Sequence, residues 1–153
     1  MLEALLVALG HAIVYALAAG VLLVVAYYVL DLVTPGHLGS HLRGIDETGA
    51  ESVHAASRSA GLVTASWLVS NALVLFTAIW TNGETSLGWA LVWTLCFGLL
   101  GVALNAVMFF VVEALTPGDL RTIVCEPGPV RPLAYVAAAS AISVALIVCA
   151  SIA

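Results

Sequence analysis

The stretch DLVTPGHL, residues Asp31 to Leu38, recurs 82 residues later as EALTPGDL, residues Glu113 to Leu120. Proline biases the residue before it away from the helical region, and the glycine that follows accepts backbone angles that other residues resist. Thr-Pro-Gly therefore predicts the end of a helix in each copy. The carboxylates of Asp31 and Glu113 then lie in a last helical turn, where the helix macrodipole disfavours an anion.

The residues around these two phrases are mostly apolar. The chain of 153 residues is 63% hydrophobic and 8% charged, whereas soluble domains carry about 25% charged residues. Four runs reach the roughly 20 apolar residues that cross a bilayer, and they are too long and too uniformly apolar for the alternating strands of a membrane barrel. We predict an all-α integral membrane protein with four transmembrane helices, at about 4–32, 56–80, 87–115 and 132–152.

All four arginines, Arg43, Arg58, Arg121 and Arg131, lie in or beside the first and third connections. Positive charge marks the cytoplasmic side of a membrane protein. We therefore expect these two longer connections in the cytoplasm, with the N-terminus, the C-terminus and the short connection at 81–86 on the other side. Nothing basic precedes the first apolar run, so we expect it to be retained rather than cleaved as a signal peptide.

Both copies of the phrase fall on the same face of the membrane. The chain is thus predicted to contain two tandem two-helix repeats, residues 1–80 and 81–153, that point the same way. Such parallel repeats are related by a pseudo-two-fold axis along the membrane normal. The even-numbered helices correspond more loosely, as VHAASRSAGLVTAS from Val53 and VRPLAYVAAASAIS from Val130, once five residues are dropped from the second connection.

The two acids of the phrase allow two interpretations. They could lie at the water interface without a specific partner, or they could form an ion pair with Arg58, which enters the second helix at about the same depth as Asp31 and Glu113. Such a pair contributes little where water reaches it and is costly to break from one side where it is buried.

Other polar residues lie within the predicted spans. His11 allows an interfacial or hydrogen-bonding role, or the handling of protons or ions. Asn71 and Asn105 are placed at mid-depth, where amides usually hydrogen-bond between helices for about 0.6 kcal/mol. Asn105 also belongs to a stripe at four-residue steps, Gly101, Asn105, Phe109 and Glu113. This stripe fits either a water-lined path or a plain helix seam.

Small residues at four-residue spacing let helices approach closely in lipid. The candidate packing positions, which could form the tightly packed centre or the contact between protomers, are Gly61, Ala65, Gly98, Gly101, Ala141 and Ala145.

Several function classes lack a sequence signal. His37 and His41 are four residues apart, but the glycines of residues 36–54 loosen the backbone and the second phrase has no histidine, so we expect a solvated loop and no metal. The three cysteines lack CxxC spacing, which predicts no disulfide. No catalytic motif or cofactor fingerprint is present, so we expect no enzyme and no cofactor. The net charge of −5 argues against a nucleic-acid partner, and the absence of lysine excludes a polybasic lipid-binding cluster.

Two tandem two-helix units, each closed by a carboxylate and Thr-Pro-Gly in DLVTPGHL and EALTPGDL, resemble the bacterial membrane family called domain of unknown function 350, the YjfL-like proteins. In that family we would expect an asparagine or glycine-asparagine at the start of the even-numbered helices, where this chain reads GAESVHAASRSAG and PGPVRPLAYVAAA. The resemblance implies a small integral membrane protein without an established activity. It also implies an association with phage-shock-type membrane-stress proteins and polyamine-conjugating or spermidine-synthase-like enzymes.

We therefore expect a multi-pass protein of the bacterial inner membrane that acts as a non-enzymatic structural or accessory subunit. Its expected partners are the lipid bilayer, further copies of itself or a membrane-protein complex, and an unidentified soluble partner in the cytoplasm. The alternative is an oligomeric small channel or transporter, in which Asn105, Glu113, Asp31 and His11 line a polar path.

Overall fold

A computed structural model describes residues 1–45, 49–52, 54–82 and 86–153. Two parts of the chain lie outside the described residues. They are part of the first connection, including Asp46 and Glu47, and the middle of the short connection at 81–86. Four long helices, each long and apolar enough to span a membrane, are α1 (Leu2–Val33), α3 (Arg58–Asn82), α4 (Leu87–Leu115) and α6 (Pro132–Ile152). The predicted all-α membrane fold is confirmed, and each predicted helix boundary lies within two residues of the observed one.

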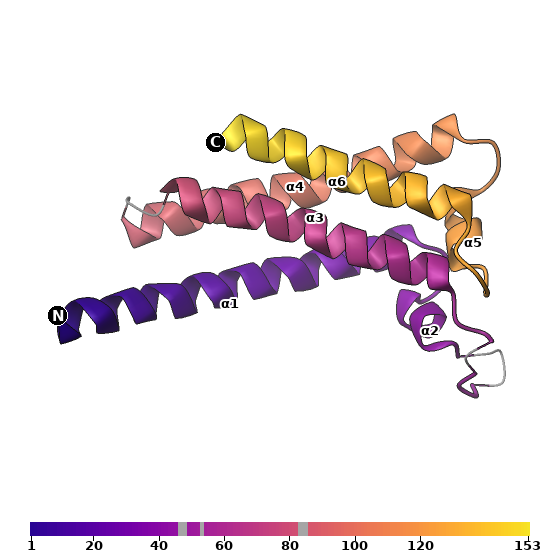
Figure 1. Cartoon of the computed structure of the whole chain (residues 1–153), viewed down its shortest axis with the longest axis horizontal. Helices are drawn as coiled ribbons and strands as arrows, with labels where there is room; N and C mark the ends of the chain where they lie inside the picture. The colour runs from indigo at the N-terminus through magenta and orange to yellow at the C-terminus, as the bar shows by residue number, and fades with distance from the viewer. Residues whose placement is uncertain (46–48, 53, 83–85) are drawn as a thin grey trace.

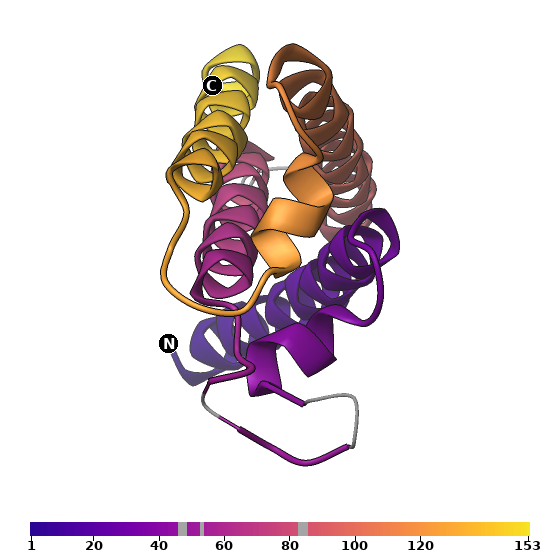
Figure 2. The ribbon, with the colours of Figure 1, turned by 90° about the vertical axis from the view of Figure 1, so that its right-hand side faces the viewer.

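Two short helices, α2 (Leu38–Arg43) and α5 (Leu120–Cys125), follow the two copies of the repeated phrase. Both lie at the same end of the bundle (Figures 1 and 2). Six residues are too few for a helix to be stable in isolation, so these helices depend on their packing. The first connection is therefore only partly a loop, and neither short helix was predicted.

The repeated phrase ends its helix in both places. Thr34 and Thr116 are extended, with φ/ψ of −85°/142° and −100°/134°, as expected of a residue before proline. The glycines that follow, Gly36 and Gly118, have φ of 77° and 105°, a region that L side chains rarely adopt. The two turns have the same design, while the pseudo-two-fold axis and the division of the chain near residue 80 stay predictions.

Helix α3 lies at the centre of the bundle. It contacts the three other long helices and both short ones, and Figure 2 shows it between α1, α4, α5 and α6. Its most extensive packing is against α6, where Ala141 and Ala145 are buried as predicted. Small side chains on α6 therefore let two parallel helices approach each other closely.

Trp67 joins three helices in the middle of the bundle. This side chain is 1% exposed and its indole Nε1 donates to the carbonyl of Ala26 in α1 at 2.9 Å. Its ring packs edge-on against Phe109 of α4, with the centroids 6.5 Å apart. Sequence reasoning missed Trp67, although a tryptophan far from both ends of an apolar run is unusual because interfacial belts are its common location.

Glycines bring α4 close to its neighbours. A Cβ added at Gly101 would lie 3.2 Å from Val74 Cγ1 of α3, and one added at Gly98 would lie 2.7 Å from Leu75 Cδ2. Both positions are buried, as a packing role requires.

Two of the predicted packing positions are less buried. Gly61 is half-buried, and a Cβ added there would come near Leu42, whereas Ala65 is exposed. Four residues advance an α-helix by about 400°, so a four-residue stripe drifts by about 40° at each step. The stripe that starts at buried Ser57 has therefore left the seam at Ala65, which is exposed in the single chain, and the alternative role of Ala65 in a contact between protomers stays a prediction.

Helix α1 diverges from the bundle towards its N-terminus (Figure 1). Its buried residues are Leu22, Ala26 and Leu30, all in its second half. With 32 residues the helix is about 48 Å long, well above the roughly 30 Å of a bilayer core. The first half of α1 is thus a mostly apolar helical segment that makes little contact with the rest of the chain.

We predict that Gly101→Leu destabilises the protein by about 1–3 kcal/mol, because the β-branched side chain of Val74 has little freedom to move away. Gly88→Leu is the matched control, since a Cβ at Gly88 meets nothing within 4 Å. Melting temperatures in detergent should fall for Gly101→Leu only. Equal melting temperatures for the two variants would contradict the close approach of α3 and α4.

Candidate functional site

The turns that end α1 and α4 are held by the same hydrogen bonds. The Thr34 amide donates to Leu30 O at 3.0 Å, and its Oγ1 lies 3.1 Å from the same carbonyl. In the second turn, the Thr116 amide and Oγ1 lie 3.0 and 2.7 Å from Val112 O. Pro35 and Pro117 have no amide to donate to the carbonyls of Asp31 and Glu113, and the same threonine hydroxyls lie 3.2 and 3.4 Å from these two carbonyls.

The first acid of the phrase anchors a short helix. Asp31 Oδ1 accepts a 2.6 Å hydrogen bond from the amide of Leu38, the first residue of α2. A carboxylate at a helix N-terminus is favourable because it meets unpaired N–H groups and the positive end of the macrodipole. The location of Asp31 at the end of α1 is thus offset by its contact with the start of α2.

The second acid uses a different donor. Glu113 Oε1 accepts from Arg121 Nε at 2.8 Å, and the Glu113 side chain is only 15% exposed. The Arg121 guanidinium also lies 5.9 Å from the centre of the Phe110 ring. The hydrogen bond to Glu113 and its negative charge raise the pKa of Arg121.

Helix α5 has its own cap. Asp119 accepts hydrogen bonds from the Thr122 amide at 3.3 Å and from the Thr122 hydroxyl at 2.8 Å. These bonds hold the pKa of Asp119 below its ordinary value. In α2 the corresponding residue, His37, makes no side-chain cap, so Asp31 and Asp119 serve the two short helices by different routes.

The predicted ion pair of Arg58 with Asp31 or Glu113 is not among the ion pairs of the described residues. Three arginines pair there with glutamates, as Arg43–Glu51, Arg121–Glu113 and Arg131–Glu126. Arg121 follows Glu113 by only eight residues and reaches it from α5. Arg58 lies exposed at the start of α3.

Two serines join the two long connections; the sequence placed Ser57 only in a small-residue packing stripe and did not single out Ser59. Ser57 Oγ donates to Val124 O of α5 at 2.6 Å and accepts from the Ala60 amide at 3.1 Å. Ser59 Oγ accepts from the Arg131 amide at 2.9 Å. Both serines are buried, so the arginine-bearing end of the bundle is held together by buried hydrogen bonds between segments far apart in sequence.

Asn71 and Asn105 occupy the same level of the α3–α4 seam. Trp67 meets Phe109 on one side of them, and Val74 meets Gly101 on the other. The two amides are 2% and 1% exposed. Asn71 Nδ2 donates to Trp67 O at 2.8 Å, while Asn71 Oδ1 and both polar atoms of the Asn105 side chain have no partner among the described residues.

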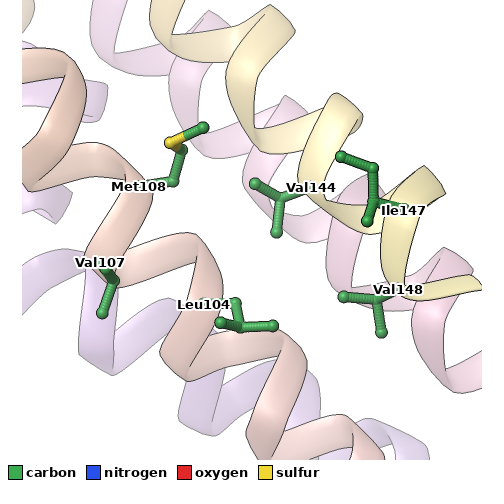
Figure 3. Close-up of a pocket in the computed structure, with 6 residues that line it drawn as sticks. All are labelled: Leu104, Val107, Met108, Val144, Ile147 and Val148. Atoms are coloured by element: carbon green, nitrogen blue, oxygen red, sulfur yellow. The ribbon is translucent and has the colours of Figure 1, made fainter. Parts of the chain in front are cut away.

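The predicted polar stripe is interrupted. Phe109 lies between Asn105 and Glu113 on α4, is 3% exposed and packs against Trp67. Beside the stripe, a cavity of about 260 Å³ between α4 and α6 is lined only by apolar residues, Leu104, Val107, Met108, Val144, Ile147 and Val148 (Figure 3). In this conformation the aromatic pair separates Asn105 from Glu113.

His11 lies apart from the other candidate residues. It is exposed in the first half of α1, a segment without buried residues. The structure thus places Asn71 and Asn105 at the same level of the α3–α4 seam, keeps Asp31 and Glu113 in separate turns, and leaves His11 outside the bundle.

His41 and Cys125 lie in surroundings that fit a structural role. His41 Nε2 lies 3.1 Å from Pro35 O, and the described residues contain no group of three or more side chains that could hold a metal ion. Burial raises the pKa of Cys125 to about 11, which leaves little reactive thiolate at neutral pH.

Comparisons with known proteins give two matches. A family model described as Domain of Unknown Function (DUF350) matches residues 4–152. The chain is 32% identical over 115 residues to a UPF0719 transmembrane protein of Mycolicibacterium paratuberculosis (strain ATCC BAA-968 / K-10). The aligned region covers 75% of this chain and 69% of that relative. No solved structure matches the chain.

We predict that Arg121→Gln lowers the melting temperature in detergent by about 2–4 °C, because it leaves a half-buried anion at the negative end of α4. Arg131→Gln is the control and should have a smaller effect, since its partner Glu126 is 49% exposed. Adding Glu113→Gln to Arg121→Gln should restore part of the loss. Equal losses for the two single variants would contradict a structural role for the Glu113–Arg121 pair.

Proposed function

This chain belongs to the family described as Domain of Unknown Function (DUF350), and we propose that it is a non-enzymatic structural or accessory subunit of the bacterial inner membrane. It is a multi-pass transmembrane protein. The proposed orientation places the arginine-bearing end, with α2 and α5, in the cytoplasm. Both termini then lie on the opposite side.

The observation that carries this proposal is the use of the two acids of the repeated phrase. Asp31 accepts from the first amide of α2, and Glu113 pairs with Arg121 of α5. Both carboxylates are thereby engaged in holding a helix end and a short helix together. A proton carrier or a catalytic acid needs access to a reacting group, and these contacts support a role in shaping the end of the bundle instead.

The surface supports an assembly role. Large apolar side chains along the first half of α1 are exposed, including Leu5, Leu9, Ile13 and Leu17. A shallow groove of about 550 Å³ continues along α1 beside Ala16 and Gly20. Small residues on an uncovered helix face allow a second helix to approach closely in lipid, so we propose that α1 is the main contact with further copies or a membrane partner.

The soluble partner would bind at the arginine-bearing end. The resemblance described above suggests membrane-stress or polyamine-linked systems as the context of this end. The exposed Arg43–Glu51 pair belongs to the described surface there, and α2 and α5 lie at the same end (Figure 1).

A second candidate, an oligomeric channel or transporter, is favoured by one observation. Asn105 is almost fully buried, and both polar atoms of its side chain lack a partner among the described residues. Unsatisfied polar groups in lipid are costly and often functional. In this candidate the Trp67–Phe109 pair would be a closed gate between the amides and Glu113.

One experiment on the purified protein distinguishes the two candidates. We expect native mass spectrometry after gentle solubilisation to show a self-associated species or a complex with a second protein, and reconstituted liposomes to show no ion flux above empty vesicles. The channel candidate predicts a flux that Asn105→Leu abolishes while the assembly state is unchanged. A flux with that dependence would overturn the accessory role, as would a protein that stays a monomer without any partner.

A further inference from the structure

The two long connections meet beside a small cavity at the arginine-bearing end. The Gly128 amide donates to Ala56 O at 3.1 Å, and the Arg58 amide donates to Gly128 O at 3.3 Å. The cavity beside this junction measures about 220 Å³ and is lined by His54, Ala56, Arg58, Gly128 and Pro129. Residues that lie 70 or more positions apart in sequence thus form one wall.

The walls of the cavity are fixed by buried contacts. Ser57 and Ser59 bond to Val124 O and to the Arg131 amide, and both serines are at most 3% exposed. The Ser57 amide also donates to His41 O at 2.9 Å, which connects the junction to α2. The backbone around Arg58 is therefore held in place before any ligand arrives, and such preorganisation lowers the entropy lost on binding.

Within the described part of the chain, the lining carries positive charge and no acidic side chain. Arg43, Arg121 and Arg131 each lie within ion-pair distance of a glutamate, whereas Arg58 has no acidic partner among the described residues. His54 adds a second side chain that can donate to an anion. A cluster that offers donors and a net positive charge selects for an anionic ligand.

Depth and size restrict the ligand further. Arg58 is the first residue of α3, so the cavity lies at one end of a helix that is long and apolar enough to span a membrane. Its volume is below the roughly 300–1,000 Å³ of sites for drug-sized molecules, and it suits one compact group. A guanidinium matches the oxygens of phosphate with two parallel hydrogen bonds.

We propose that the cavity of Arg58, His54 and Gly128 binds a phosphate group, presented either by the headgroup of an anionic phospholipid or by a soluble phosphate compound. This site differs from a polybasic cluster, because it uses one arginine and one histidine in a fixed frame. It is independent of the proposed accessory role, since it depends only on the junction of the two connections.

The test compares Arg58→Gln with Arg43→Gln, which removes the same charge from the first connection outside the cavity. Phosphatidylglycerol is titrated into the detergent-solubilised protein and followed by native mass spectrometry, and sodium phosphate is titrated in a separate calorimetric arm. We expect Arg58→Gln to weaken binding of at least one probe about tenfold, which corresponds to about 1.4 kcal/mol. Arg43→Gln should bind as the wild type does, and the probe that responds identifies the source of the phosphate.

Two further variants keep the test independent of folding. Arg58→Lys retains the charge without the two-pronged donor, so its affinity should lie between those of the wild type and Arg58→Gln. His54 lies outside the helices. The variant His54→Gln should weaken binding of the same probe severalfold. Binding of both probes that is unchanged in Arg58→Gln and His54→Gln, or reduced equally by Arg43→Gln, would overturn the proposal.

Discussion

The ends of α1 and α4 depend on a threonine hydroxyl that lies against the carbonyls three and four residues earlier. Inside a bilayer a helix satisfies its own backbone, but its last carbonyls need other partners when the chain turns away. Thr34 and Thr116 supply them, while proline prevents the helix from continuing and glycine reverses the chain. Both helices consequently end at the same end of the bundle, where the turns bring Asp31 and Glu113 within reach of α2 and α5.

The interior of the bundle follows from how closely the helices approach. Glycines on α4 and alanines on α6 let both helices lie near α3, and among the described residues Trp67 and Phe109 are the only buried aromatic side chains. The indole N–H of Trp67 donates to Ala26 O. The side-chain amide of Asn105 has no partner among the described residues. The buried amides of Asn71 and Asn105 therefore lie next to the close approach of α3 and α4 at Gly101, and their role depends on whether the two helices separate there.

The sequence was sufficient for the long helices because apolar runs of spanning length and a proline-glycine stop are local signals. The short helices α2 and α5 were missed because their stability comes from contacts such as Leu38 with Asp31 and Ser57 with Val124. The interpretation that paired Arg58 with Asp31 or Glu113 rested on depth in the membrane alone. Arg121 follows Glu113 by only eight residues and forms the ion pair with it instead. Ala65 was placed on a seam by counting in fours, which neglects the drift of a helix with 3.6 residues per turn.

The most direct measurement is the accessibility of single cysteines, in a cysteine-free background, to a membrane-impermeant maleimide. Arg43→Cys and Glu126→Cys place labels on the two long connections, and Ser86→Cys places one on the short connection; all three positions are exposed. We expect the first two to react only in inside-out vesicles and the third only in intact cells. Reaction of Arg43→Cys and Glu126→Cys from opposite sides would contradict two spanning helices that end in equivalent turns at one membrane face.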